Sequence, residues 1–410
     1  MNGNVFDRRE LFKKAAATSA GAGLLGLATG QGTAVAQDAP AASATPAAKV
    51  PMRPFGATGE KIPILVMGGS QDFDLKYEKK LHRAFEEGVT YIDTAEKYTN
   101  GNSHVAVGAF IEQVGRKNVW ITSKSGLWGN APECPPDKLL AAIEKEMPVL
   151  KTDYLDMYFM HGVRDIAMLD DPWIQMGQDM KKKGLTRFFG FSCHDGNVVD
   201  LMNKAAALGA GKIDGIMFRY SFAMYGNTEL NKAIDACVKA GIGLIAMKTQ
   251  ASVLDDSEEV KRFQSDNYNL FQAKLKAVWA DERISGAVSS MRNTDQIDQN
   301  VAAAKSPVQL SMKEWMQLNQ FAARTANHRC NGCRENCESQ IAGNTRVADS
   351  LRYLMYAECY GDFAEARQLY RSMGHDQRFD ESIDYAAAAK ACPQRIDIAA
   401  RLRDAHTRLA

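Results

Sequence analysis

TYIDTAEKYTNGNSHVAVGAFIEQVGRKNVWITSK occupies residues 90–124 and contains one complete strand, helix and strand. The apolar runs at residues 90–93 and 119–123 have the length of buried strands, and apolar residues between positions 103 and 114 recur with helical spacing. The polar, glycine-containing loop before the helix is typical of a βα turn. This unit predicts two parallel strands joined by a crossover helix.

The same unit recurs along the chain from residue 64 to residue 304. Apolar runs predict strands at residues 64–67, 90–93, 119–123, 155–160, 188–192, 215–219, 243–247 and 286–289. Helical periodicity predicts helices at residues 78–87, 103–114, 136–150, 173–183, 197–208, 228–240, 270–280 and 294–304. Eight such units predict an α/β fold, a closed (β/α)8 TIM barrel, with a hairpin at residues 54–63 plugging its floor. An open doubly wound sheet is disfavoured because no G-x-G-x-x-G motif opens the first βα turn.

Composition favours small-molecule chemistry. A length of 410 residues accommodates one barrel of roughly 250 residues and a small appendage. Fifty basic residues stand against forty-nine acidic ones, so no net field attracts nucleic acid or anionic lipid. We therefore expect no nucleic-acid partner.

The N-terminus has the pattern of an export signal. Arg8 and Arg9 precede an uncharged run, residues 15–36, which ends in the small-residue triplet Ala34-Val35-Ala36. This order resembles a twin-arginine signal, which the twin-arginine export machinery reads, and it predicts a periplasmic or otherwise exported protein. The predicted divisions are a signal peptide at residues 1–36, a flexible linker at 37–50, the barrel at 51–325, and a small, mostly helical, cysteine-containing extension at 326–410.

Four polar residues lie where predicted strands end, at the face on which (β/α)8 barrels build their active sites. Asp93 ends the second run, Tyr98 lies in the loop after it, Lys124 follows the third run and His161 follows the fourth. A phenol can donate the proton that a developing alkoxide needs, and a nearby cation typically lowers its pKa by roughly one to three units. We therefore expect Lys124 to lower the pKa of Tyr98 while Asp93 holds the ammonium. His161 is expected to hydrogen-bond the carbonyl oxygen.

The segments around these residues resemble aldo/keto reductase family motifs, in the family's order. They are Tyr91-Ile92-Asp93-Thr94-Ala95 with Tyr98, Trp120-Ile121-Thr122-Ser123-Lys124, and Asp153-Tyr154-Leu155-Asp156 through His161-Gly162. The resemblance covers residues 53–304. It implies an oxidoreductase that interconverts a small-molecule carbonyl and an alcohol by hydride transfer, with Tyr98 as general acid or base.

The resemblance also implies NADP(H), or less often NAD(H), as a cofactor bound without a Rossmann motif. It places Ser192 and His194 beside the nicotinamide and Tyr220 beneath its ring. Around the adenosine phosphate it places Ser290, Met291, Arg292, Gln296, Gln299 and Asn300. Met217 and Ser221 stand where the family usually has Gln and Asn. This departure weakens the implied binding of the nicotinamide carboxamide. Arg292 fits either a 2′-phosphate partner, which favours NADP, or a surface arginine.

Five of the eight cysteines lie between residues 330 and 392, a clustering that suggests a metal site rather than a disulfide scaffold. The first three have C-x2-C-x3-C spacing, and the last precedes a proline. This pattern resembles the ferredoxin-like tail of one branch of the family. It implies one [4Fe–4S] cluster held by Cys330, Cys333, Cys337 and Cys392. A zinc site that uses His328 or Cys359 and a tail without metal remain alternatives.

The sequence leaves two classes of function open. The first is the redox enzyme described above, coupled through the cluster to an electron-transfer partner. Because free NADPH is not expected outside the cytoplasm, an exported enzyme must hold its cofactor tightly, be recharged through the tail, or have lost turnover. The second is a non-catalytic exported binding or assembly protein that keeps the barrel as a scaffold.

Overall fold

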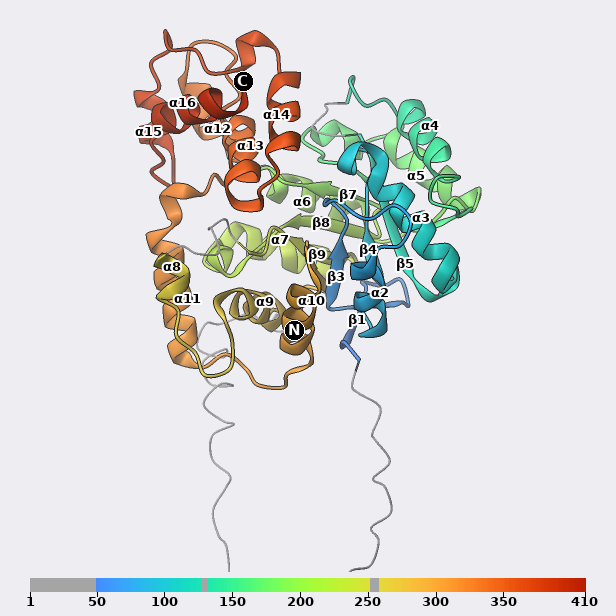
Figure 1. Ribbon diagram of the computed structural model, residues 1–410. Helices are drawn as coiled ribbons and strands as arrows, with labels where there is room; N and C mark the ends of the chain where they lie inside the picture. The colour runs from blue at the N-terminus through green and yellow to red at the C-terminus, as the bar shows by residue number, and fades with distance from the viewer. Residues whose placement is uncertain (1–48, 127–130, 251–257) are drawn as a thin grey trace, which may run out of the picture.

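The computed structural model describes residues 49–126, 131–250 and 258–410 (Figure 1). In these residues eight parallel strands close into a barrel, in the order β10, β3, β4, β5, β6, β7, β8 and β9. Their bounds are Leu65–Gly68 (β3), Tyr91–Asp93 (β4), Trp120–Ser125 (β5), Leu155–Met160 (β6), Thr186–Cys193 (β7), Gly215–Arg219 (β8), Gly243–Met247 (β9) and Gly286–Ser289 (β10). The predicted (β/α)8 barrel is confirmed, and each predicted strand overlaps an observed one.

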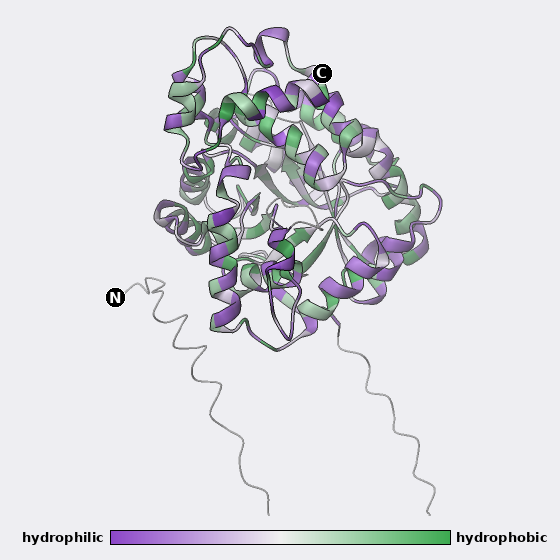
Figure 2. Cartoon of the chain, turned by 60° about the vertical axis from the view of Figure 1, so that its left-hand side comes forward, coloured by the Kyte–Doolittle hydropathy of each residue, from purple (hydrophilic) through white to green (hydrophobic). Residues whose placement is uncertain are grey.

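Helices surround the barrel because the amphipathic segments between the strands pack their apolar faces on the sheet. They are α2 (Lys79–Glu86), α3 (Asn102–Val114), α4 (Pro136–Glu146), α5 (Trp173–Lys182), α6 (Val198–Leu208), α7 (Thr228–Lys239), α8 (Glu258–Lys261), α9 (Leu270–Ala280), α10 (Thr294–Lys305) and α11 (Met312–Arg324). Local signals set their starts: a capping box of Asn269 and Gln272 begins α9, for example. Figure 2 shows the mixed polar and apolar colouring of the outer helices. None of the helices in the described residues has the length and apolar content needed to span a membrane.

A two-stranded hairpin closes the floor of the barrel, as predicted. Strands β1 (Met52–Pro54) and β2 (Lys61–Pro63) pair antiparallel, and the fully buried Phe55 follows β1. A Cβ added to Gly215 or Gly243 would lie 2.5 or 2.4 Å from the Phe55 ring. Glycine at the start of β8 and β9 therefore makes room for the ring that fills the barrel end.

The C-terminal extension is helical and has small cores of its own. Its helices are α12 (Arg334–Cys337), α13 (Val347–Tyr360), α14 (Phe363–Ser372), α15 (Ala386–Ala391) and α16 (Ile398–Leu409). Leu354, Tyr370 and Leu409 lie in one apolar cluster that joins α13, α14 and α16. The sequence predicts helices at residues 346–360 and 362–371, which match α13 and α14, but it did not predict α11, α12, α15 or α16.

Buried ion pairs attach the extension to the barrel. Arg164, from the loop after β6, pairs with Asp349 on α13 and lies 2.9 Å from Asp195, which follows β7. Arg352 on α13 lies 2.5 Å from the other oxygen of Asp195. All four side chains are buried, so each charge depends on its partners. The extension, orange to red in Figure 1, therefore covers the carboxyl ends of the strands, where the predicted catalytic residues lie.

Candidate active site

The structure brings the four predicted catalytic residues together. Asp93 is the last residue of β4, Lys124 lies on β5, and His161 directly follows β6 and donates its backbone N–H to the carbonyl of Ser125. Lys124 Nζ lies 2.6 Å from Asp93 Oδ1 and donates to Tyr98 Oη at 3.1 Å. The Tyr98 and His161 rings meet edge to face, with centroids 5.6 Å apart. A phenol, an ammonium, a carboxylate and an imidazole thus form one connected group of four side chains, the tetrad.

The loop that carries Tyr98 has an unusual backbone. Tyr98 begins a short 3-10 turn, Tyr98–Gly101, in which Thr99 and Asn100 adopt left-handed φ values of 48° and 55°. A β-branched residue rarely adopts such angles, so the surrounding structure must stabilise this turn. The Lys124 ammonium does so in part, because it donates at 2.9 Å to the carbonyl of Thr94 in the same loop.

Burial dominates the electrostatics of the group. It raises the pKa of Asp93 and lowers that of Lys124, and the ion pair between them opposes both shifts. Burial, aided by the charge of Asp93, raises the pKa of the Tyr98 phenol well above its usual range. The structure therefore reverses the predicted direction for Tyr98, because burial and the negative charge of Asp93 both raise the pKa of the phenol. The phenol is held protonated, ready to donate.

His161 is held in the neutral form. Burial lowers its pKa well below the usual range, and the positive charges of Lys124 and Lys248 act in the same direction. A neutral imidazole has one N–H donor and can present it to a carbonyl oxygen. A neutral donor is what the role expected for His161 requires, and that role stays a prediction.

The three residues predicted to surround the nicotinamide have different environments. Ser192 is fully buried, and its hydroxyl accepts a hydrogen bond from the backbone of Gly162 at 3.0 Å. His194 lines a cavity at the barrel mouth. Tyr220 does not line that cavity: its ring is fully buried in the core, and its hydroxyl donates to Asp281 at 2.5 Å. Because side chains alternate along an extended chain, the neighbouring Arg219 lines the cavity instead.

The residues predicted to surround the adenosine phosphate mostly bond within the protein. Asn300 donates to the Ser289 hydroxyl at 3.2 Å. The Gln296 side chain accepts from the backbone N–H of Arg292, and the Gln299 side chain accepts from Asn269. These contacts give three of the predicted residues a role in shaping the loop after β10.

The other members of this predicted set differ in exposure. Met291 is fully buried, whereas Ser290 is exposed. Arg292 is exposed, and its guanidinium pairs at 2.7 Å with Asp362, which directly precedes α14. The guanidinium that was expected to face a 2′-phosphate is therefore paired with a carboxylate of the extension.

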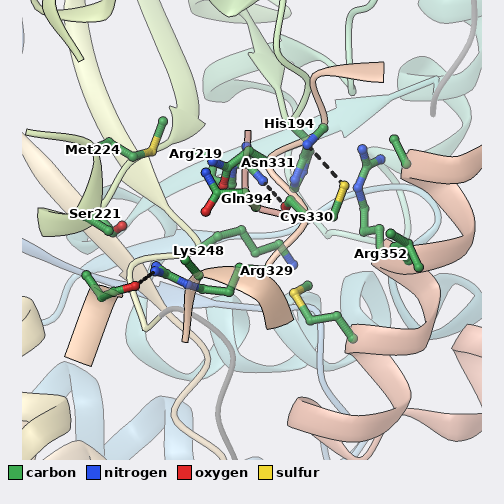
Figure 3. Close-up of a pocket in the computed structure, with 17 residues that line it drawn as sticks. His194, Arg219, Ser221, Met224, Lys248, Arg329, Cys330, Asn331, Arg352 and Gln394 are labelled. Carbon is green, nitrogen blue, oxygen red and sulfur yellow. Dashed lines mark hydrogen bonds between the residues drawn. The ribbon is translucent and has the colours of Figure 1, made fainter. Parts of the chain in front are cut away.

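A cavity of about 170 Å³ lies between the barrel mouth and the extension (Figure 3). Its cationic and imidazole side chains come from both parts of the chain: His194, Arg219, Lys248, Arg329 and Arg352. Sequence reasoning missed all of them except His194. Arg219 and Lys248 stand at the ends of predicted strands, and that position was the available signal.

The four cysteines predicted as metal ligands line a second, smaller cavity of about 20 Å³. The backbone N–H of Gly332 points to the Cys330 sulfur at 3.4 Å, and Arg219 donates to the Cys330 carbonyl at 2.6 Å. Neither His328 nor Cys359 lines this cavity, so the zinc alternatives built on those residues lack support from the geometry. Within the described residues, no three His, Cys, Asp or Glu side chains are grouped closely enough to hold a metal ion.

A family model described as "Aldo/keto reductase family" matches residues 67–278, slightly more than half of the chain. The chain belongs to the aldo/keto reductase family. The prediction of an aldo/keto reductase-type enzyme is confirmed at this level.

Curated relatives match over part of the chain. Methylglyoxal reductase DkgB of Escherichia coli O157:H7 is 28% identical over 225 residues, which cover 54% of this chain and 79% of DkgB. The uncharacterized oxidoreductase YqkF of Bacillus subtilis is 31% identical over 124 residues, which cover 29% of this chain and 40% of YqkF. The match thus spans less than half of YqkF but most of DkgB.

Solved structures support the fold. An aldo-keto reductase from Klebsiella pneumoniae in complex with NADPH has a TM-score of 0.53 and 20% identity, covering 66% of this chain and 95% of that one. A holo aldo-keto reductase from Bacillus halodurans has the same TM-score and identity, covering 66% and 96%. At these identities the likeness concerns the barrel alone. The predicted signal peptide lies outside the described residues.

Proposed function

We propose that this aldo/keto reductase reduces a small-molecule carbonyl to an alcohol, and catalyses the reverse oxidation, by hydride transfer with NADP(H). The observation that carries the proposal is the Lys124 ammonium, which contacts both Asp93 and the Tyr98 hydroxyl beside a neutral His161. Family membership and the reductase names of relatives such as DkgB support it.

The residues act on the proton and on the carbonyl oxygen. NADPH, when bound, would supply the hydride that the carbonyl carbon accepts. His161 donates a hydrogen bond to the carbonyl oxygen, and Tyr98 Oη gives that oxygen its proton, so that the substrate gains one hydride and one proton. The phenolate left on Tyr98 is stabilised by the Lys124 ammonium, and Asp93 keeps that ammonium in place.

The residues fit a nicotinamide cofactor in part. Ser290 is exposed after β10 and could hold a phosphate, whereas the guanidinium of Arg292 is already paired with Asp362. His194 lies at the barrel mouth. Tyr220 does not fit a stacking role, because its ring is buried in the core. The Klebsiella neighbour in complex with NADPH supports the choice of NADP(H) over other cofactors. Equilibrium titration with NADPH and NADH, followed by cofactor fluorescence, tests this choice.

The deciding experiment replaces Tyr98 by Phe. We expect carbonyl reduction to fall by at least about a hundredfold while NADPH binding stays within about twofold, because the phenol acts on the proton and not on the cofactor. Tyr77→Phe, at an exposed tyrosine, is the matched control. Full carbonyl-reducing activity in the Tyr98→Phe protein would refute the assignment of Tyr98 as the proton donor. A wild-type protein that binds NADPH but reduces no carbonyl would favour the scaffold alternative.

We also propose that Cys330, Cys333, Cys337 and Cys392 hold one [4Fe–4S] cluster, which exchanges electrons with a partner protein. The support is that all four cysteines line one small cavity although Cys392 is remote in sequence. In the described residues these cysteines are not grouped closely enough for a single metal ion, so the proposal concerns the larger cluster only. Anaerobic protein should contain about four irons per chain, and Cys392→Ser should remove them while Cys359→Ser should not. Zinc in place of iron, or no metal in either protein, would refute the cluster.

We further propose that the protein is exported by the twin-arginine machinery to the periplasm. The support is the order of Arg8, Arg9, the uncharged run and the small-residue triplet. Replacing both arginines by lysine should leave uncleaved protein in the cytoplasm. Normal export of that variant would argue for another route.

A further inference from the structure

A hydroxyl, an imidazole and a carboxylate form a buried chain behind the strand that carries Lys124. His104 on α3 lies with Nε2 2.9 Å from Ser123 Oγ on β5 and with Nδ1 3.2 Å from Glu146 Oε2 at the end of α4. The His104 and Ser123 side chains are fully buried, whereas Glu146 is partly exposed. The chain thus runs from the surface of the molecule to the residue next to Lys124.

This chain is not a nucleophilic site. The same three groups activate a hydroxyl in many hydrolases, but there the hydroxyl must meet a substrate. Ser123 is fully buried, and its side chain points away from the barrel interior because that of Lys124, the next residue, points into it towards Tyr98. We therefore look for an effect of the chain on the protein itself.

The partners of His104 fix the positions of its protons. A carboxylate only accepts hydrogen bonds, so Nδ1 carries the hydrogen that Glu146 accepts. Burial lowers the pKa of His104, although Glu146 opposes this shift, and the neutral imidazole then has Nε2 as an acceptor for the Ser123 hydroxyl. Each group has a defined role as donor or acceptor, so the imidazole has one orientation.

The first turn of α3 also holds the loop that carries Tyr98. Ser103, next to His104, lies with Oγ 2.7 Å from the Thr94 hydroxyl, and the carbonyl of Thr94 accepts from Lys124 Nζ at 2.9 Å. The strained 3-10 turn that begins at Tyr98 leads directly into α3. The start of α3 is therefore joined to both sides of the contact between Lys124 and Tyr98.

The chain is costly at this place in the fold. Its surroundings on α3 and β5 are apolar, and Val107, Phe110 and Ile121 are buried in the main core. Burying polar groups is unfavourable unless they are hydrogen-bonded, and a carboxylate in the last position of a helix, such as Glu146, opposes the helix dipole. Local stability favours neither feature, whereas a requirement for fixed geometry accounts for both.

We propose that His104 is a positioning residue for the tetrad. By linking α3 to β5 through Ser123, it keeps the Lys124 ammonium within hydrogen-bond distance of the Tyr98 hydroxyl, at 3.1 Å. A displacement of about 1 Å in a catalytic group can lower a rate about a hundredfold, so small movements of α3 matter. The effect on the rate rests on the proposed reduction, whereas the effect on the geometry does not.

The first test is steady-state reduction of methylglyoxal with NADPH by the full-length protein, with kcat expressed per NADPH-binding site. His104→Leu removes both hydrogen bonds, and Ser123→Ala removes one of them. Each should lower kcat about tenfold or more, while KM and the Kd for NADPH stay within about twofold. His104→Gln, whose amide can donate and accept, should keep most of the activity. His82→Gln is the control, because it changes an imidazole on α2 that also packs against α3, at Phe110.

The double variant separates positioning from general destabilisation. If His104 acts through Ser123, the protein with both His104→Leu and Ser123→Ala should be no slower than the slower single variant, because the two changes break one link. Losses of kcat that multiply in the double variant would overturn the proposal. So would an unchanged kcat per site in a folded single variant, even if its free energy of unfolding falls.

Crystal structures test the geometry without any turnover. We expect the distance from Lys124 Nζ to Tyr98 Oη to exceed hydrogen-bond distance in His104→Leu and to match wild type in His82→Gln. An unchanged distance in His104→Leu would refute the positioning role. A wild-type protein that binds NADPH but reduces no carbonyl would count against the proposed function, and the crystallographic distance would still decide the role of His104.

Discussion

The contact between Asp93 and Lys124 is the residue-scale basis of the site. Both side chains are buried, and the 2.6 Å ion pair is what keeps two charges stable there. Lys124→Met should therefore abolish reduction and also lower the free energy of unfolding by about 3 to 5 kcal/mol, because Asp93 loses its partner. Urea unfolding and steady-state kinetics measure the two effects. Asp93→Asn combined with Lys124→Met should recover much of the stability but none of the activity.

Two buried histidines make stability depend on pH. Burial lowers the pKa of His161 and His194 well below the usual range, and Lys248 acts in the same direction on both. Because the unfolded chain binds protons near pH 6.5 and the folded protein does not, this stability is present above pH 6.5 and is lost as the pH falls. Each histidine should lower the free energy of unfolding by about 1 kcal/mol between pH 7.5 and pH 5.5. His194→Gln should flatten the profile, measured by urea unfolding at both values; an unchanged slope would contradict the argument.

At the scale of elements, the loop after β7 and the cysteine loop fit closely against each other. The backbone N–H of Gly196 donates to the carbonyl of Gly332 at 2.9 Å, and a Cβ on Gly196 would lie 2.6 Å from the Cα of Cys333. The backbone of Cys333 cannot move aside as the end of a flexible side chain can. Gly196→Ala should therefore shift the cysteine loop and destabilise the protein by about 1 to 3 kcal/mol.

The shift of the cysteine loop in Gly196→Ala can be followed by two measurements, the iron content of the protein and the alkylation rate of Cys333. If the cysteines hold a cluster, anaerobic protein of this variant should contain less iron than wild type, and Cys333 should react faster with an alkylating reagent. Unchanged alkylation would mean that the loop tolerates the added methyl group.

At the scale of the whole molecule, the buried network of Arg164, Asp195, Asp349 and Arg352 holds the extension on the barrel. Asp349→Asn leaves Arg164 short of a buried partner and should destabilise the docked state by about 3 kcal/mol or more. Hydrogen exchange should speed up in α13 and α14 before it changes in the barrel strands. Glu229→Gln, which removes an exposed pair with Lys232, should change stability by less than about 0.5 kcal/mol. Equal acceleration throughout the chain would mean that barrel and extension unfold as one unit.

The sequence by itself determined the barrel and the tetrad. Alternation of apolar runs with helical periodicity is a local property, and it located strands such as residues 215–219 and 243–247 at their observed bounds. Asp93, Lys124 and His161 were predictable because strand ends of a closed parallel barrel share one face. Residues at the ends of successive strands can therefore be placed at the same face of the barrel from the sequence alone.

Tertiary structure decided what surrounds the tetrad. Tyr356 on α13 and Glu365 on α14 contribute to the raised pKa of Tyr98, and the sequence alone could not place these two helices over the barrel mouth. Whether Arg219 or Tyr220 faces the cavity depends on where β8 ends, and a shift of one residue exchanges the two. The convergence of Lys248 with Arg329 requires contacts between segments about eighty residues apart. Such contacts arise from packing of the whole chain, and no local pattern encodes them.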